Sequence, residues 1–198
     1  EDWLNNWKKY FKPLKIGKRL FVRPIWEESF DAENRVVLNI EPGAAFGTGA
    51  HDTTRLCLET LDKIIKDGDT VLDIGCGSGI LAISAMLLGA KEGFGVDIDP
   101  LAVKIAAENG KMNNFTEPQL QFVCGDLADK VTKKYDVVVL VLLKPRNHLV
   151  NHFICLWRMA VFNAFARQIL VIPSNRRWIH IYNNIVYIAN NHRGCILV

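Results

Sequence analysis

The segment from residue 71 to residue 83, VLDIGCGSGILAI, restricts the fold of this chain more than any other feature. A short apolar run leads directly into glycines at positions 75, 77 and 79, and an apolar helical pattern follows without a break. Glycines at alternate positions allow a tight turn and leave room for a ligand close to the backbone, and the helix N-terminus beyond them attracts polar groups. This order of strand, glycine loop and helix is typical of doubly wound α/β folds, whose ligands bind at the carboxyl ends of the strands.

The residues around this loop continue the alternation of strand and helix. They predict helices over 52–65, from the glycine loop to residue 88, and over 100–114, and strands over 70–75, 92–99, 120–126 and 135–143. Asp52 or Thr53 is expected to cap the first helix, Gly89 to end the second, and Asp99 to cap the third. Strands joined by helices of this length form a parallel sheet, so we predict an α/β fold with a Rossmann-like, doubly wound sheet and helices on both faces.

The first forty residues precede this alternation. Aromatic residues recur at helical spacing over 3–11 and Pro13 follows, which predicts a short helix that either covers a core or offers an aromatic and basic docking surface. Residues 19–26 and 35–40 are typical of strands separated by a polar turn. We therefore expect a linker helix and N-terminal strands in residues 1–40, and one ligand-binding domain in residues 41–198.

The spacing of the glycine loop discriminates between nucleotide ligands. In a dinucleotide fingerprint, G-x-G-x-x-G, the third glycine comes one residue later than Gly79 does here. Asp73 would also place a carboxylate near a pyrophosphate, which is electrostatically unfavourable. The same carboxylate favours a ligand with an ammonium and a sulfonium group. We therefore predict that a site including Asp73, Gly75 and Gly77 binds S-adenosylmethionine, with S-adenosylhomocysteine as the product.

Residues after the next two strands extend this candidate site. Asp97 ends the second strand, where the comparable acid of dinucleotide folds accepts hydrogen bonds from the ribose. Ile98 would then lie against the adenine ring. Asp126, after the third strand, either accepts a hydrogen bond from the adenine amino group or serves as a helix cap or loop acid. Cys76 has no histidine placed to activate it, so we expect no nucleophile there.

Composition and charge exclude several classes of protein. The five cysteines lack CxxC spacing, which argues against a disulfide framework or a zinc cluster, and we expect no metal site. No segment resembles a signal peptide or an uninterrupted membrane span, so we expect a cytoplasmic protein without membrane contact. Residues 137–198 hold 7 of the 24 basic residues and none of the 21 acidic ones. Those basic residues are scattered among apolar ones, so no direct nucleic-acid binding is expected.

Four segments resemble one family: AFGTGAHDTT (45–54), TVLDIGCGSGILAISAMLLGA (70–90), GVDIDP (95–100) and YDVVV (135–139). They are similar to the catalytic domain of ribosomal protein L11 methyltransferases, which are class I S-adenosylmethionine-dependent enzymes, and the resemblance covers about residues 1–139. It implies that Thr54, Gly75 and Asp97 bind the cofactor. It also implies that the loop from Phe46 to Gly49, which includes Thr48, lies over the methionine end of the cofactor. His51 would either position the substrate or, as we favour, start the following helix.

Members of this family trimethylate amino groups of a large-subunit ribosomal protein, on lysine side chains and on the N-terminal amine. The resemblance therefore implies a protein methyltransferase with a ribosomal protein as its substrate. One alternative is a class I methyltransferase for nucleic acid or a small molecule, which should carry an Asn/Asp-Pro-Pro-aromatic motif after the fourth strand. Lys144-Pro145 does not supply this motif. The other alternative is a cofactor-binding module without catalysis. The sequence assigns no catalytic residue and no oligomeric state.

The chain departs from the family pattern in two places. The family carries a separate N-terminal domain that recognises the ribosomal protein, and this chain begins within the linker, so we expect substrate docking to be missing. After Val139 the family continues Ala-Asn-Ile, with the asparagine near the transferred methyl group, whereas this chain has Leu140, Val141 and Leu142. A coding frameshift would explain this change together with the acid-free tail, and an intact reading frame around codon 139 would contradict it. Otherwise the β-like segments ILVI, WIHIYNNIVYI and CILV form replacement strands.

Overall fold

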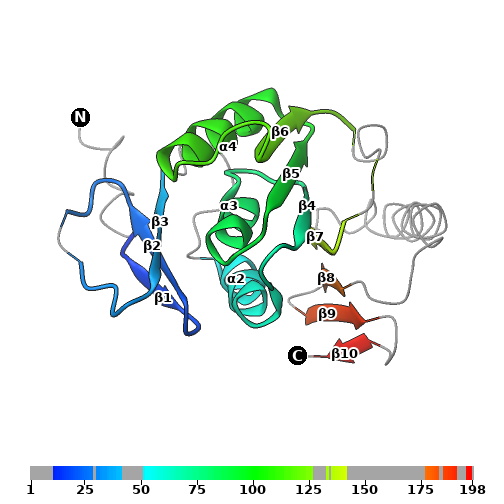
Figure 1. Ribbon diagram of the computed structural model, residues 1–198, viewed down its shortest axis with the longest axis horizontal. Coiled ribbons are helices and arrows are strands. Elements are labelled where there is room, and N and C mark those ends of the chain that lie inside the picture. Colours follow the sequence, from blue (N-terminus) through cyan, green and yellow to red (C-terminus); the bar gives the residue numbers. More distant parts are fainter. Residues whose placement is uncertain are drawn as a thin grey trace, which may run out of the picture.

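Three layers make up the molecule. The computed structural model describes residues 11–28, 30–41, 51–126, 133, 135–141, 177–182, 185–190 and 195–197, and beyond Val139 it describes the backbone only. Within these residues, a layer of helices lies between a small and a large β-sheet (Figure 1). The large sheet contains β4 (Thr70–Ile74), β5 (Glu92–Asp97), β6 (Leu120–Cys124), β7 (Val137–Val141), β8 (Arg177–Tyr182), β9 (Ile185–Asn190) and β10 (Cys195–Leu197).

The large sheet has the order β10-β9-β8-β7-β4-β5-β6. The strands from β8 to β6 in this order are all parallel, which confirms the predicted parallel sheet. β4 pairs with β5 on one side and with β7 on the other, so the strand order reverses there and creates the crevice in which doubly wound folds bind ligands. In the tail, the segments WIHIYNNIVYI and CILV do form strands, with β9 antiparallel to both β8 and β10. The segment ILVI lies outside the described residues.

The described helices cover one face of the large sheet. They are α2 (Asp52–Ile64), α3 (Ile80–Leu87) and α4 (Pro100–Met112). α3 joins β4 to β5 and α4 joins β5 to β6, and two right-handed crossovers in the same direction lie on the same face. α2 packs against α3. The opposite face is also buried, since Leu72, Ile74 and Val138 are at most 4% exposed. Among the described residues no helix covers that face, where the sequence predicted helices without giving their positions.

The ends of the helices follow the sequence with one exception. Asp99 caps α4, because its carboxylate accepts a hydrogen bond from the Leu101 N–H at 2.9 Å. Gly89, with a φ of 116°, directly follows Leu88, the C-cap residue of α3, so this helix ends where it was predicted to end. The N-cap predicted for α2 was wrong: His51 caps this helix through Nδ1, which accepts from the Thr53 N–H at 3.3 Å. Asp52 instead lies in the first turn, where a carboxylate is favoured by the helix dipole.

The small sheet has the order β1-β2-β3, with β1 at Leu14–Ile16, β2 at Leu20–Pro24 and β3 at Val36–Ile40. The two predicted N-terminal strands correspond to β2 and β3, which run parallel to each other. β1 was not predicted, because three residues between Pro13 and Gly17 are too few to show a period of two. The helix predicted over 3–11 falls outside the described residues except for Phe11.

The small sheet, the helices and the large sheet share one hydrophobic core. Completely buried members come from all three layers, among them the aliphatic residues Ile16, Leu20, Leu38, Ile40, Leu58, Leu61, Ile83, Val71, Val137 and Val139. Full burial of each such aliphatic side chain contributes roughly 1.5–3 kcal/mol to folding. Residues before and after position 40 therefore belong to the same core. Among the described residues, no helix is long and apolar enough to cross a bilayer.

Arg19 and Asp62 fasten the small sheet to the helices. Asp62 of α2 is 7% exposed, and its carboxylate accepts hydrogen bonds from the N–H groups of Lys18 at 2.9 Å and Arg19 at 3.0 Å. The Arg19 guanidinium donates to the carbonyls of Ile65 and Leu88, at the C-terminal ends of α2 and α3. A cation at this position satisfies free carbonyls and is favoured by the helix dipole. The small sheet is thus fixed to the helix that follows the glycine loop.

Candidate functional site

The glycine loop adopts the tight turn that its sequence predicts. Gly75, Gly77 and Gly79 have φ values of 75°, 53° and 79°, in the left-handed region that side chains rarely adopt. The N–H groups of Gly75 and Cys76 both donate to the Val96 carbonyl of β5, at 2.8 and 3.1 Å. The loop is therefore anchored to the neighbouring strand and held beside the end of β5.

The third glycine has a packing role. A Cβ atom on Gly79 would lie 3.0 Å from Cβ of Ala106 in α4 and 2.9 Å from Cζ of Phe122 in β6. Gly79 also precedes α3 directly and occupies its N-cap position without a side chain. The absence of a side chain at this position lets the start of α3 approach α4 closely, and this contact sets the position of the loop on the sheet.

Asp97 is hydrogen-bonded to the glycine loop. It ends β5, and its Oδ2 accepts from the Gly77 N–H at 2.8 Å while its Oδ1 accepts from the Asp99 N–H at 3.0 Å. The side chain is half-buried. An ionised carboxylate offers about four lone-pair sites, so Asp97 can accept further hydrogen bonds from the two hydroxyls of a ribose. The adjacent Ile98 is 70% exposed and offers an apolar surface next to this carboxylate.

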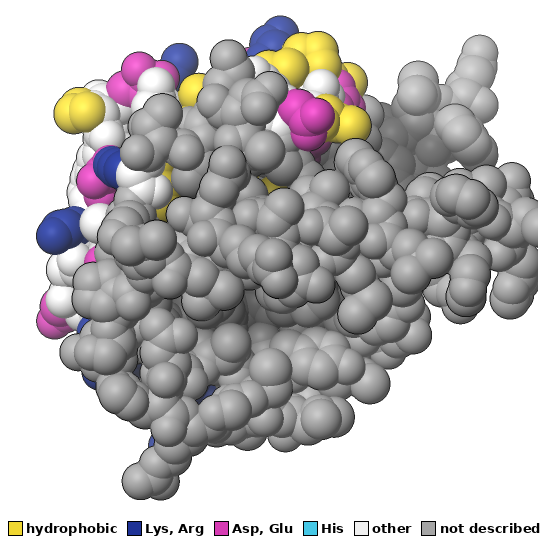
Figure 2. All heavy atoms as spheres, turned by 90° about the vertical axis from the view of Figure 1, so that its right-hand side faces the viewer, with side chains coloured by type: hydrophobic (Ala, Val, Ile, Leu, Met, Phe, Trp, Pro, Cys, Tyr) yellow, Lys and Arg dark blue, Asp and Glu magenta, His cyan; other side chains and the backbone are white. Residues whose placement is uncertain are grey.

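Asp126 lies beyond the end of β6, at the same edge of the sheet. The Gly125 N–H donates to the Asp97 carbonyl at 3.0 Å, which brings the residues after β6 next to the end of β5. Asp126 itself is exposed. Both alternatives for this residue stay open, because a hydrogen bond to adenine and a role as cap or loop acid are each compatible with an exposed carboxylate here. Figure 2 shows hydrophobic and acidic side chains next to one another at the top of the molecule, the level of α4 and β6 in Figure 1.

Asp73 lies beneath the start of α3. It is in β4, its side chain is completely buried, and Oδ2 accepts from the Ala82 N–H in the first turn of α3 at 3.2 Å. Oδ1 has no hydrogen-bond partner among the described residues. Burial raises the pKa of Asp73 to about 7, against the lowering effect of the Ala82 N–H and with a smaller contribution from the Asp97 carboxylate. A partly ionised carboxyl group is therefore held directly behind the glycine loop.

We expect stability to depend on pH through Asp73. Its pKa of about 7 in the folded chain exceeds the value of about 3.9 in the unfolded chain, so the folded state binds more protons between these pH values. The stability that this group contributes is complete below pH 4 and is lost as the pH rises through 7. From pH 5 to pH 8, unaltered protein should therefore lose about 2–3 kcal/mol more of its free energy of unfolding than Asp73→Asn. Urea unfolding at both pH values measures this difference, and equal losses would contradict it.

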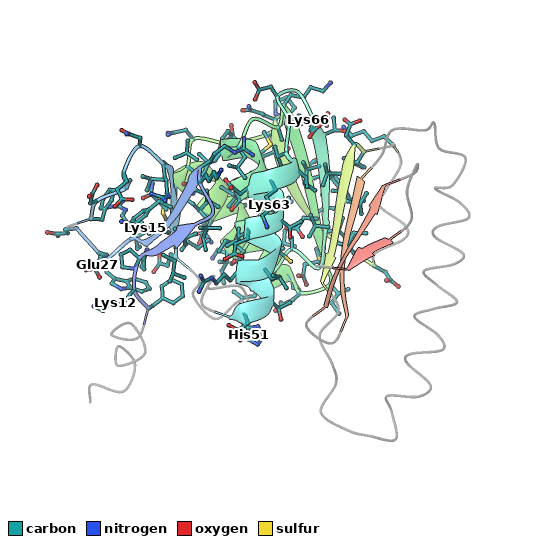
Figure 3. All side chains as sticks on the ribbon, turned by 90° about the horizontal axis from the view of Figure 1, so that it is seen from below. Lys12, Lys15, Glu27, His51, Lys63 and Lys66 are labelled. Atoms are coloured by element: carbon teal, nitrogen blue, oxygen red, sulfur yellow. The ribbon has the colours of Figure 1, made fainter. Side chains whose placement is uncertain are left out.

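The other predicted site residues lie on or before α2. Thr54 is in the first turn of α2 and is 4% exposed. Among the described residues, hydrogen bonds join the glycine loop to Asp97 and none joins it to Thr54. His51 lies at the N-terminal end of α2, as Figure 3 shows, so the interpretation that it starts this helix is confirmed. Phe46 and Thr48 lie outside the described residues.

The described part of the site contains neither a reactive thiol at Cys76 nor a cluster of metal-binding side chains. The Cys76 side chain is 4% exposed, and burial raises the pKa of its thiol, so the group stays protonated at neutral pH. A protonated thiol is a poor nucleophile. Over the described ranges, no group of three or more His, Cys, Asp or Glu side chains is arranged to hold a metal ion.

Sequence reasoning missed two residues next to the loop, Asn109 and Asn113. Asn109 lies on the buried side of α4 and Asn113 is the C-cap residue of this helix, at 1% and 6% exposure. The Asn109 amide donates to the Ser78 carbonyl within the loop at 2.9 Å. The signal that could have found them is the sequence of α4. Two polar residues one helical turn apart, on the face that otherwise buries Ala102 and Ala106, need hydrogen-bond partners in the interior.

A family model and curated relatives identify one family. A family model described as ribosomal protein L11 methyltransferase (PrmA) matches residues 1–158, which extends past Val139. A ribosomal protein L11 methyltransferase of Caldanaerobacter subterraneus subsp. tengcongensis is 50% identical over 139 residues, which cover 70% of this chain and 44% of that protein. One from Clostridium botulinum is 43% identical over 174 residues, 88% of this chain and 53% of that protein. The chain spans about half the length of these curated relatives.

A solved structure with a similar fold bears a related name. The crystal structure of ribosomal protein L11 methylase from Lactobacillus delbrueckii subsp. bulgaricus is 25% identical to this chain, with a TM-score of 0.68. The similarity covers 86% of this chain and 79% of that one. The match therefore extends well beyond the glycine loop and its two flanking strands.

Proposed function

Because this chain belongs to the ribosomal protein L11 methyltransferase family, we propose that it is the catalytic part of an S-adenosylmethionine-dependent methyltransferase acting on amino groups of ribosomal protein L11. The acceptor groups would be lysine side chains and the N-terminal amine. With a ribosomal protein as its substrate, the enzyme would act in the cytoplasm. We expect neither a membrane nor a nucleic acid as a direct partner.

One observation carries this proposal: the glycine loop with three positive φ values is hydrogen-bonded through Gly77 to the Asp97 carboxylate. The loop leaves the backbone accessible, and the acid beside it can accept from ribose hydroxyls. Asp97 thus offers the ribose site, Ile98 an apolar surface for adenine, and Gly75 and Gly77 the surface for the methionine part. Thr54, Phe46, Thr48 and Asp126 are further cofactor contacts in this proposal.

Asp73 supports S-adenosylmethionine over a dinucleotide. With a pKa of about 7, its carboxyl group is about half ionised at neutral pH, so it places negative charge directly behind the loop. In a buried setting this charge acts through a low effective dielectric constant, which repels a pyrophosphate and attracts an ammonium or sulfonium group. The unpartnered Oδ1 atom gives the carboxylate spare capacity to accept a hydrogen bond. The residues present therefore fit this cofactor.

When bound, S-adenosylmethionine would supply a methyl group on a positively charged sulfur: an uncharged amine would attack the methyl carbon in line, the carbon–sulfur bond would break, and S-adenosylhomocysteine would leave. The residues of this chain would contribute alignment rather than a covalent nucleophile. Asp97 and the glycine loop hold the ribose and methionine parts, and a fixed geometry of the reacting atoms accounts for much of the rate in such displacements. A lysine acceptor, with an ordinary pKa of about 10.4, must lose its proton first, and an apolar surrounding assists that loss.

Removing the Asp97 carboxylate is expected to weaken cofactor binding strongly. Asp97→Ala should raise the dissociation constant of S-adenosylhomocysteine by about ten- to a hundredfold, because charge-assisted hydrogen bonds to the ribose are lost. Calorimetric titration measures this change. Asp99→Ala is the matched control: it removes an acid two residues away and the cap of α4, but leaves Asp97 in place. An unchanged dissociation constant in Asp97→Ala would contradict the assignment of the ribose site.

Two experiments test the function as a whole. Titration of the chain with S-adenosylmethionine and, separately, with NAD distinguishes a methyltransferase site from a dinucleotide site, and binding of NAD alone would overturn the proposal. Incubation with labelled S-adenosylmethionine and purified ribosomal proteins then tests the acceptor.

The second candidate function is a cofactor-binding module without turnover, which Val141 favours because valine offers no amide where the family carries asparagine. Binding without methyl transfer to L11, by this chain and also after a substrate-recognition domain is fused to it and Leu140-Val141-Leu142 is replaced by Ala-Asn-Ile, would support that alternative.

A further inference from the structure

Two buried asparagines, one in α4 and one at its C-cap, lie between the glycine loop and the small sheet. Asn109 and Asn113 are one helical turn apart, and each side-chain amide makes three hydrogen bonds within the described residues. A buried amide is unfavourable unless its donors and its acceptor are paired. Both side chains are therefore fixed in position by their partners. The orientation of each amide is also fixed, because a backbone N–H can only donate and a carbonyl can only accept.

The two amides bind backbone groups at the free edge of β3 and directly after it, in the manner of a neighbouring strand. Asn113 accepts from the Asn39 N–H at 2.8 Å and donates to the Asn39 carbonyl at 2.7 Å. Asn109 does the same two residues further along, accepting from the Glu41 N–H at 2.9 Å and donating to the Glu41 carbonyl at 3.1 Å. β3 pairs with β2 on its other edge, so the two amides satisfy backbone groups that none of the described strands reaches.

The third hydrogen bond distinguishes the two asparagines. Asn113 donates to the Asn109 carbonyl of its own helix at 2.8 Å, whereas Asn109 donates to the Ser78 carbonyl at 2.9 Å. Ser78 is completely buried and lies between Gly77, which is hydrogen-bonded to Asp97, and Gly79, which precedes α3. Asn109 therefore links the loop, α4 and the residue after β3, while Asn113 links only the helix and the strand.

We propose that Asn109 is a positioning residue for cofactor binding: it holds the Ser78 carbonyl and so keeps the glycine loop in the conformation that presents Gly77 to Asp97. This inference rests on the proposed function, because it concerns the loop assigned to S-adenosylmethionine. Glycine residues have the greatest backbone freedom, so a loop with three of them gains many conformations when an anchor is removed. Ordering that loop again on binding then lowers the affinity for the ligand.

The experiment compares Asn109→Ala with Asn113→Ala in the full chain. Each variant loses three side-chain hydrogen bonds, two of them to the backbone of Asn39 in β3 or of Glu41 directly after it, so both should lower the melting temperature by a similar amount. The dissociation constant of S-adenosylhomocysteine is measured by calorimetry at a temperature at which circular dichroism shows both variants folded. Asn109→Ala should raise it by about tenfold, the effect of one lost anchor, whereas Asn113→Ala should leave it within about twofold of the unaltered chain.

The same measurements can overturn the inference. Equal changes in the dissociation constant for both variants would reduce Asn109 to a structural role, and an unchanged constant in Asn109→Ala would have the same meaning. If Asn109→Ala does not fold, Asn109→Ser replaces it under the same criterion, because the serine hydroxyl can hydrogen-bond one partner but is too short to bridge Glu41 and Ser78 at once. If the unaltered chain does not bind S-adenosylhomocysteine, the proposed function is wrong and the inference fails with it. If the unaltered chain and both variants bind S-adenosylhomocysteine equally well, the proposed function stands and only the inference about Asn109 is contradicted.

Discussion

Replacement of Gly75 by valine is expected to abolish detectable binding of S-adenosylhomocysteine while the chain stays folded. Gly75 has a φ of 75°, and a β-branched residue in that region carries strain of about 1–3 kcal/mol. Relief of this strain would turn the backbone of the loop, and the valine methyl groups would occupy space next to the bound methionine part. Calorimetric titration measures binding, and circular dichroism with thermal melting measures folding.

Gly68→Val is the matched control for this prediction. Gly68 also has a positive φ, 84°, and a Cβ atom there meets nothing within 4 Å, so valine at this position adds backbone strain without crowding. It lies in the turn before β4, at the opposite end of that strand from the glycine loop. Gly68→Val should therefore lower the melting temperature and leave the dissociation constant unchanged. Normal binding by Gly75→Val would show that the loop serves the fold and not the ligand.

The glycine loop and Asp97 could be predicted from the sequence because both depend on local structure. Alternate glycines after an apolar strand specify a turn with positive φ, and an acid that ends the next parallel strand must lie at the same edge of the sheet. The hydrogen bond between Gly77 and Asp97 is added by the structure and was not predicted. The parallel order of β4, β5, β6 and β7 was predictable from local structure as well, since the helices between the first three are visible as periodic segments.

Features that depend on contacts distant in sequence could not be predicted. Asn109 is 31 residues from Ser78 and 68 from Glu41, so its role appears only when α4 lies between the loop and β3. Asp73 was expected to interact with the ligand, but its complete burial under α3 and its raised pKa depend on how the helix packs over the strand. His51 replaced the predicted cap of α2 because an imidazole nitrogen can accept the same N–H that a carboxylate or hydroxyl would.

The departure from the family after Val139 has the largest expected consequence for turnover. β7 ends at Val141, and Leu140 pairs with Ile74, so the backbone of residue 141 lies beside the start of the glycine loop. The resemblance assigns an asparagine to this position, close to the transferred methyl group. An amide there would orient the methionine part or the incoming amine, and valine has no polar atom with which to do so. The ribose contact at Asp97 and the loop contacts do not depend on this residue.

We therefore expect this chain to bind S-adenosylhomocysteine detectably but to transfer methyl groups to L11 very poorly, even with a substrate-recognition domain from a relative fused at its N-terminus. Misalignment of the reacting atoms by as little as about 1 Å can lower the rate by about a hundredfold, which sets the scale of the loss.

Replacing Leu140-Val141-Leu142 by Ala-Asn-Ile in this fusion should recover part of the activity. The control carries Leu140→Ala and Leu142→Ile with Val141 kept, and should recover none, because it repeats the apolar changes without the amide. Normal turnover by the fusion with Val141 unchanged would contradict the importance of the asparagine, and equal recovery in the control would assign the effect to packing at the end of β7.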